Sequence, residues 1–195
     1  MLQSFFPMPK KFFGSAVAWS MAVIFLWYSG GKDLGNVFGL QFPDKDADPV
    51  IGLGHFATDD FIWFYIYYSF FTLIFYGFWS NFAPHRWQLW SILGSALILF
   101  FTYFQVQVAV AVNNWYRPFY DAIQNALSNE STTTAADLYG YMLSFLILAM
   151  TYVLFSVLTS FFVSHYIFRW RTAMNDYYTE RWKLVRQIEG ASQRI

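Results

Sequence analysis

Residues 138–164 read LYGYMLSFLILAMTYVLFSVLTSFFVS, and no charged side chain interrupts this stretch. A helix needs about 20 mostly apolar residues to cross the hydrocarbon core of a bilayer, where no water satisfies open backbone groups. Comparable charge-free stretches lie upstream, and all are too long and too uniformly apolar for the alternating strands of a β-barrel. We therefore predict an all-α membrane protein with four transmembrane helices, at about residues 12–31, 61–82, 91–112 and 138–164.

The composition of the 195-residue chain also indicates a lipid environment. Hydrophobic residues make up 57% and charged residues only 12%, whereas about 25% of the residues in a typical soluble domain are charged. The chain has no cysteine, which excludes disulfides, thiolate nucleophiles and cysteine-bound zinc. The three histidines, at positions 55, 85 and 165, lie far apart and have no partners at metal-binding spacing. We therefore expect neither a metal nor a cofactor.

The charged residues divide unevenly between the two sides that four spans create. The net charge is zero, with 12 basic and 12 acidic residues, which argues against a nucleic-acid-binding protein. With a cytoplasmic N-terminus, nine basic residues are cytoplasmic: Lys10, Lys11, Arg86, Arg169, Arg171, Arg181, Lys183, Arg186 and Arg194. Lys and Arg in short flanking segments accumulate on the cytoplasmic side. We therefore predict a multi-pass protein whose N- and C-termini are both cytoplasmic, with nine of the 12 acids on the opposite side.

The tail at residues 165–195 is predicted to continue the fourth span as a long cytoplasmic helix. Apolar and aromatic residues, among them Tyr166, Trp170 and Tyr177, recur near one face, and no proline interrupts the pattern. The pattern suits either a basic helix at the lipid headgroups or half of a helical bundle. No helix-ending signal follows Gly190, so we expect the chain to be truncated within this helical pattern.

Polar residues gather in the third span, where an amide is costly unless it finds a partner or a wet cavity. They are Gln105, Gln107, Asn113 and Asn114. Tyr103 lies four residues before Gln107, so the two share a helical face. Two interpretations stay open: the polar residues line a substrate cavity, or their amides form hydrogen bonds between helices.

A second candidate group follows directly and consists of Trp115, Tyr116, Arg117 and Asp121. Trp and Tyr at the end of a span typically lie in the interfacial belt. We expect Pro118 to force Arg117 out of helical geometry and to start a new segment. If that segment is helical, Arg117 and Asp121 have the spacing of an ion pair. Together with Tyr103 and the four amides, these residues form our candidate substrate cavity.

The sequence carries no sign of catalytic machinery. The four predicted spans contain no Asp, Glu, Lys, Arg or His, the residues that usually mark chemistry at membrane depth. Neither a G-x-S-x-G nor an H-E-x-x-H motif occurs. The string Gly30-Gly31-Lys32-Asp33 lacks the upstream glycine and the following Ser or Thr of a P-loop. We therefore predict that the chain is not an enzyme and carries no ATP site of its own.

Five strings of the chain carry a further signal. They are Ser4-Phe5-Phe6-Pro7, residues 80–94, residues 110–121 (VAVNNWYRPFYD), residues 162–175 (FVSHYIFRWRTAMN) and residues 188–194. In these strings the chain resembles the SbmA/BacA-like peptide transporters of bacterial inner membranes. The strings run in order across essentially the whole chain, and the longer ones are highly specific.

The resemblance implies a fold like the membrane domain of ABC exporters, with an extra N-terminal helix and without a nucleotide-binding domain. Because members of the family are about twice this length, it also implies that this chain is the N-terminal half of such a protein. It implies a homodimer that imports peptides, including proline-rich antimicrobial peptides and microcins, across the inner membrane by means of the proton gradient. The implied partners are membrane lipid, peptide substrates and a second copy of the chain. By the same resemblance, Glu189 belongs to, or neighbours, a cytoplasmic glutamate series in proton coupling.

Two alternatives from other functional classes stay open. The tail also resembles the membrane subunits of peroxisomal acyl-CoA-type ABC transporters, which makes a transmembrane subunit of an ATP-driven exporter the second interpretation. The third is a membrane anchor that transports nothing. A Walker A motif downstream would favour the exporter, and a second set of spans without that motif would favour proton-driven import.

Overall fold

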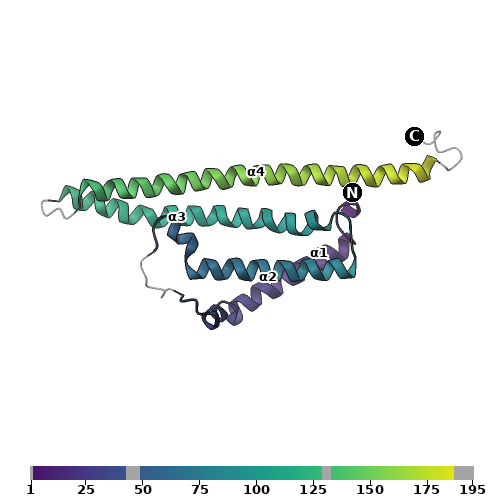
Figure 1. The fold of residues 1–195 in the computed structure, drawn as a ribbon, viewed down its shortest axis with the longest axis horizontal. Helices are drawn as coiled ribbons and strands as arrows, with labels where there is room; N and C mark the ends of the chain where they lie inside the picture. The colour runs from purple at the N-terminus through teal and green to yellow at the C-terminus, as the bar shows by residue number, and fades with distance from the viewer. Residues whose placement is uncertain (1, 43–48, 129–132, 187–195) are drawn as a thin grey trace. The chain divides into compact units, whose positions relative to one another are not determined.

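The protein is described by a computed structural model that covers residues 2–42, 49–128 and 133–186. Four long helices carry the fold, namely α1 (Pro9–Leu26), α2 (Asp59–Phe82), α3 (Ser95–Leu127) and α4 (Ala135–Arg186) (Figure 1). No β-strand occurs within the covered ranges. Four segments are long and apolar enough to cross a membrane: Pro9–Gly31, Asp59–Phe82, Leu89–Leu127 and Ala135–Trp182. The prediction of an all-α membrane protein with four spanning helices is confirmed.

Short helical segments connect the long helices. The 3-10 helices are η1 (Leu2–Ser4), η3 (Asp33–Phe38) and η4 (Gly52–Ala57), and two π-helices, η2 (Trp27–Gly31) and η5 (Leu89–Gly94), adjoin α1 and α3. A capping box starts α4: Thr134 Oγ1 accepts from the Asp137 backbone N–H at 3.3 Å, and the Asp137 carboxylate accepts from the Thr134 backbone N–H at 2.8 Å. This reciprocal pair explains why the last long helix begins where it does.

Helix α4, drawn from green to yellow in Figure 1, continues without interruption from the fourth apolar stretch into the predicted tail helix. Its 52 residues exceed the roughly 20 that a span requires. The last part of the predicted tail, residues 187–195, lies outside the described residues.

Helix α3 does not end at Pro118, so the prediction of a new segment there was wrong. The helix runs from Ser95 to Leu127 with Pro118 inside it. Pro118 has no N–H to give to the carbonyl of Asn114, a defect that costs roughly 3 kcal/mol in a helix interior. The helix nevertheless continues, because Trp115 before the proline and Ala122 after it are both buried on the packed face of α3.

The described residues form two compact units, which we treat separately. Of the described residues, unit 1 contains those within 2–25, 71–98 and 161–186, and unit 2 contains those within 26–42, 49–70, 99–128 and 133–160. Both definitions join stretches that are far apart in the sequence. Each unit therefore depends on packing between helices rather than on local structure alone.

The core of unit 1 is a cluster of buried, mostly aromatic side chains. Its buried members are Phe5, Phe6, Phe12, Trp79, Ile92 and Ala173. The Phe5 ring is fully buried, stacked on Trp170 with centroids 5.8 Å apart and edge-on to Tyr166 at 5.2 Å. Trp79 is 1% exposed, and its indole Nε1 donates to Ser15 Oγ at 3.2 Å. The N-terminal segment thus packs on the aromatic residues of α2 and α4.

Polar contacts also link the separate segments of unit 1. The Ser95 and Tyr166 hydroxyls form a hydrogen bond of 2.8 Å. The buried Gln88 side chain donates to Ser80 Oγ at 3.0 Å and to the Tyr76 carbonyl at 3.3 Å. Because each buried amide or hydroxyl finds a partner, these residues fix the connection between α2 and α3 at little desolvation cost.

The core of unit 2 lies along one face of α3. The buried residues Phe101, Phe104, Val108, Ala111, Trp115 and Ala122 recur at helical spacing. The Phe104 ring stacks on Phe155 of α4, with ring centroids 3.9 Å apart, and on Phe56 of η4 at 4.6 Å. Close packing of this kind holds helices together in a bilayer, because the hydrophobic effect does not favour helix association in lipid.

Two glycines end the first spanning segment within unit 2. Gly30 has φ = 134°, a conformation that L-residues with side chains rarely adopt. A Cβ added at Gly31 would lie 2.7 Å from the Leu26 carbonyl oxygen. The Gly31 carbonyl accepts a hydrogen bond of 2.9 Å from Trp63 Nε1. The chain therefore turns at a point where a side chain would collide with backbone.

Candidate functional site

The candidate site lies in unit 2, on the polar positions of α3 and the segments that contact them. The Gln105 side chain forms a hydrogen bond between two helices of the fold. Its amide Nε2 donates to Thr159 Oγ1 of α4 at 3.0 Å, and Thr159 donates in turn to the Phe155 carbonyl at 2.7 Å. Of the two interpretations that the sequence left open, interhelical hydrogen bonding therefore describes Gln105.

Gln107 has different surroundings, because two residues along α3 place it on nearly the opposite face from Gln105. Its side chain lies within hydrogen-bonding reach of both Tyr103, one turn earlier, and His55 of η4. The Tyr103 ring also packs on Phe64, with ring centroids 4.4 Å apart. We call His55, Tyr103 and Gln107 the His55 cluster. It brings an imidazole, a phenol and an amide together from two segments of the chain.

The His55 ring is held by aromatic contacts more than by polar ones. It lies edge-on to Phe61 at 4.8 Å and to Phe56 at 5.3 Å. Burial lowers the pKa of His55 below its usual value, and the Gln107 side chain partly opposes this by favouring the charged form. His55 Nε2 is buried without a hydrogen-bond partner among the described residues. The ring is therefore neutral near pH 7 and has unused hydrogen-bonding capacity.

The other predicted site residues occupy three kinds of position. Trp115 is a core residue, whose Nε1 donates to the Tyr141 carbonyl at 2.8 Å and whose ring stacks on Phe119 at 4.4 Å. Asn113 is exposed and Asn114 is half-buried. Tyr116 is 47% exposed, and its ring lies parallel to that of Tyr120 one turn later.

Arg117 and Asp121 form the ion pair that their spacing predicts. Arg117 Nε lies 3.8 Å from Asp121 Oδ2. The side chains are 90% and 60% exposed, so the pair adds little to stability and both groups stay accessible to solutes.

Asp121 also lines an open hollow of about 650 Å³. The hollow lies where the C-terminal part of α3 meets the first turns of α4, and its polar lining includes Asn125, Asp137, Tyr141 and Ser144. Two carboxylates, an amide and two hydroxyls on one hollow could bind a cationic, hydrogen-bonding group of a solute.

Glu189, the candidate for proton coupling, lies outside the described residues. Within the ranges that the structure covers, no group of three or more His, Asp or Glu side chains could hold a metal ion.

Sequence reasoning missed His55, Asn125 and Asp137. His55 precedes Gln107 by 52 positions, and no periodic pattern links a loop residue to a helix face at that distance. For Asp137 a signal existed: Thr134 and Asp137 have the spacing of a capping box. That motif places Asp137 in the first turn of α4, beside the end of α3 once the two helices pair.

One comparison with known proteins bears on this site. The SbmA/BacA-like family pattern matches residues 84–195, more than half of the chain and all of α3. The family is one of membrane peptide transporters and not of enzymes. The match agrees with the four spanning helices, which make this a multi-pass membrane protein. The chain therefore belongs to the SbmA/BacA-like family.

Proposed function

We propose that the protein serves proton-gradient-driven import of peptides, including antimicrobial peptides, across the bacterial inner membrane, and that it acts as a homodimer with an ABC-exporter-like membrane domain. The observation that carries this proposal is the family match over residues 84–195. The match includes all of α3, which carries every candidate residue of the predicted cavity. In this proposal both termini are cytoplasmic, as the distribution of Lys and Arg predicts.

The chemistry of unit 2 supports a peptide as the substrate. Backbone amides need both donors and acceptors, and the His55 cluster provides both from an imidazole, a phenol and an amide. The aromatic rings of Phe56 and Phe64 adjoin the cluster and offer flat apolar surfaces. Such a combination of apolar walls with a few polar groups is typical of binding sites.

The carboxylates of the hollow at the end of α3 support a preference for cationic peptides. Asp121 and Asp137 both line this hollow. Only Arg117 forms an ion pair with Asp121 among the described residues, and that pair is solvent-exposed. An arginine or lysine of a peptide could therefore compete for the Asp121 carboxylate at small cost.

Proton coupling is assigned to Glu189 and to residues of the same cytoplasmic series. This part of the proposal rests on the family resemblance, and it makes a specific demand: uptake must stop when the gradient collapses. A transmembrane subunit of an ATP-driven exporter would behave in the opposite way.

The test measures uptake of a fluorescent proline-rich peptide by transporter-deficient bacteria that express the full-length protein. We expect uptake to disappear on addition of a protonophore while cellular ATP is kept constant. Uptake that survives loss of the gradient but requires ATP would contradict the proposal and favour the exporter alternative. No uptake at matched membrane expression would favour the non-transporting anchor.

A pair of variants tests the candidate site itself. Gln107→Leu removes the amide of the His55 cluster, whereas Gln124→Leu makes the same change at an exposed position of the same helix. We expect Q107L to reduce uptake about tenfold or more, in line with the loss of a half-buried hydrogen-bonding group from a site built around it. Q124L should leave uptake unchanged. Equal uptake by both variants at equal expression would remove Gln107 from the site.

A further inference from the structure

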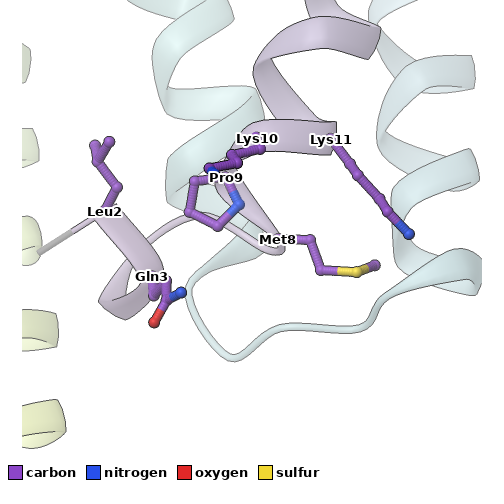
Figure 2. Close-up of a pocket in the computed structure, with 6 residues that line it drawn as sticks. All are labelled: Leu2, Gln3, Met8, Pro9, Lys10 and Lys11. Atoms are coloured by element: carbon purple, nitrogen blue, oxygen red, sulfur yellow. The ribbon is translucent and has the colours of Figure 1, made fainter.

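An open hollow in unit 1 is not used by the proposed transport function. It has a volume of about 610 Å³ and is lined by Leu2, Gln3, Met8, Pro9, Lys10 and Lys11 (Figure 2). Figure 2 shows Leu2 and Gln3 on η1, while Met8 and Lys11 extend in a common direction near the start of α1. The hollow is thus formed by a short helix, the bend after it and the first turn of a spanning segment.

The walls of this hollow are held in place by the core of unit 1. Phe5 and Phe6, between η1 and the bend, are 0% and 6% exposed and belong to the aromatic cluster. On the η1 side, Gln3 Oε1 accepts a hydrogen bond of 3.1 Å from the Tyr177 hydroxyl. Met8 has φ = 39°, an uncommon conformation that a well-packed neighbourhood must maintain. The hollow is therefore a formed feature of the unit.

The lining combines apolar side chains with two lysines whose positive charges have no acidic partner among the described residues. Leu2 and Met8 are 44% and 41% exposed, although both are apolar. Lys10 and Lys11 form no ion pair with the described residues, and the first turn of α1 contains no acidic side chain. The two lysine charges lie at the N-terminus of α1, where the positive end of the helix dipole repels them. An anion in the hollow would relieve this repulsion, and an apolar chain would cover Leu2 and Met8.

The position of the hollow indicates where such a molecule comes from. It lies at the first residues of the segment Pro9–Gly31, which is apolar enough to cross a membrane. Lysines that flank a span lie at the level of the lipid headgroups, with the acyl chains immediately beside them. A phospholipid presents a phosphate and an apolar chain in that same order.

We propose that this hollow is a binding site for one anionic phospholipid, with its headgroup phosphate on Lys10 and Lys11 and an acyl chain against Leu2 and Met8. The site is independent of peptide import and of the His55 cluster. Its function would be to fix the N-terminal segment, and through Phe5 the core of unit 1, to the membrane surface. A zwitterionic lipid of equal chain length should bind more weakly, because its headgroup carries no net charge to pair with the two lysines.

The test is a lipid titration of the detergent-purified full-length protein, followed by native mass spectrometry. The three probes are dioleoyl phosphatidylglycerol, dioleoyl phosphatidylcholine and glycerol 3-phosphate. We expect one phosphatidylglycerol to bind more tightly than phosphatidylcholine. In the double variant Lys10→Gln/Lys11→Gln, the Kd for phosphatidylglycerol should rise about 25-fold, because the loss of each lysine near an anionic lipid weakens binding about fivefold. Met8→Ser should weaken both lipids by roughly threefold, because it makes the apolar wall polar.

A matched control distinguishes a site from diffuse attraction. Arg171→Gln/Arg186→Gln removes the same charge from exposed positions of α4 outside the hollow. This variant should bind phosphatidylglycerol within twofold of the unaltered protein. Equal losses in the two double variants would overturn the proposal, and so would glycerol 3-phosphate binding as tightly as the lipid. Unchanged phosphatidylglycerol binding by K10Q/K11Q, with the fold intact by circular dichroism, would also overturn it.

Discussion

Units 1 and 2 are built from neighbouring stretches of the same long helices, yet they use polar residues in different ways. In unit 1 the buried Gln88 side chain donates to Ser80, and Ser95 pairs with Tyr166, while the buried Trp170 Nε1 has no hydrogen-bond partner among the described residues. In unit 2, Gln105 is paired with Thr159, but His55 Nε2 has no partner among the described residues, and Gln107 is shared between His55 and Tyr103. Unsatisfied capacity in a buried position costs stability. The two units differ in what surrounds the unpaired group. In unit 2 the unpaired imidazole nitrogen belongs to a cluster with Tyr103 and Gln107, whereas in unit 1 the Trp170 ring packs against the aromatic rings of Phe5 and Phe6.

The largest expected effect tests the scaffold role of unit 1. Trp79→Ala empties a position that is 1% exposed and removes the hydrogen bond to Ser15. We expect a loss of about 3–5 kcal/mol in the free energy of unfolding, as for other buried aromatic residues. The measurement is thermal unfolding in detergent. Phe78→Ala is the control, because Phe78 is 54% exposed. A comparable loss in both variants would show that Trp79 is not a special core position.

A smaller effect separates the two glutamines of unit 2. Gln105→Leu breaks the hydrogen bond to Thr159, and we expect it to cost about 0.6–1 kcal/mol, the usual range for bonds between spanning helices. A double-mutant cycle with Thr159→Val should return a coupling of about 0.6 kcal/mol. Gln107→Leu should leave the unfolding midpoint unchanged or higher while reducing uptake. A larger stability loss for Q107L than for Q105L would reverse the assignment of the two residues.

The ion pair of unit 1 should contribute still less. Arg86 Nη1 lies 3.2 Å from Asp176 Oδ2, but the side chains are 74% and 34% exposed. Solvent screening limits such a pair to about 0.2–1 kcal/mol, which falls as salt is added. We expect Arg86→Gln to lower the unfolding midpoint slightly at low salt and not at all at 1 M salt. The charge-swapped variant R86D/D176R should recover part of the loss. A loss that is independent of salt would point to the contact of Arg86 with the Trp87 ring instead.

The smallest effect compares one histidine in each unit. Burial lowers the pKa of His55 in unit 2 and of His85 in unit 1, while Gln107 and the Gln3 backbone respectively oppose the shift. Because the folded-state pKa lies below the unfolded value of about 6.5, the unfolded chain takes up protons first. The stability contribution is therefore complete above about pH 6.5 and is lost as the pH falls through the folded pKa.

The measurement is the unfolding midpoint between pH 7.5 and pH 5.5 for the unaltered protein, H55Q, H85Q and the double variant. We expect the midpoint to fall on acidification and to fall least in the double variant. The single variants then show which unit is more sensitive to pH. A midpoint that rises on acidification would contradict the direction of both shifts.

The fold was largely predictable because its signal is contained in single stretches of sequence. The absence of charge between positions 138 and 164 requires nothing from the rest of the chain to indicate a span. The ends of the helices were less predictable. Pro118 is a strong local signal for a helix boundary, but packing of Trp115 and Ala122 on either side outweighs it. Helix α3 therefore extends almost three turns further than local rules allow.

The candidate site was only partly predictable, because its contacts join distant positions. Tyr103 and Gln107 share a helical face by spacing alone, and Arg117 and Asp121 pair as expected. Whether an amide is structural or free depends on what faces it. Thr159 decides this for Gln105, and it lies 54 positions away. Phe5 and Phe6 were recognised only as part of a family string, since two aromatics before a span carry no periodic signal. Their burial is visible only once α2 and α4 are in place.

The turn at Gly30 and Gly31 has a consequence for how this sequence can drift over evolutionary time. Gly31 has no room for a methyl group, and Gly30 has a backbone conformation that side chains oppose. Gly14, Gly77 and Gly140 meet nothing within 4 Å of an added Cβ, and alanine there would favour the helix. In a library of every single substitution, selected for peptide uptake, alanine should therefore be common among survivors at the three helical glycines and nearly absent at Gly31. The same contrast should appear in any collection of natural variants, where Gly31 would persist as the fixed boundary of the first spanning segment.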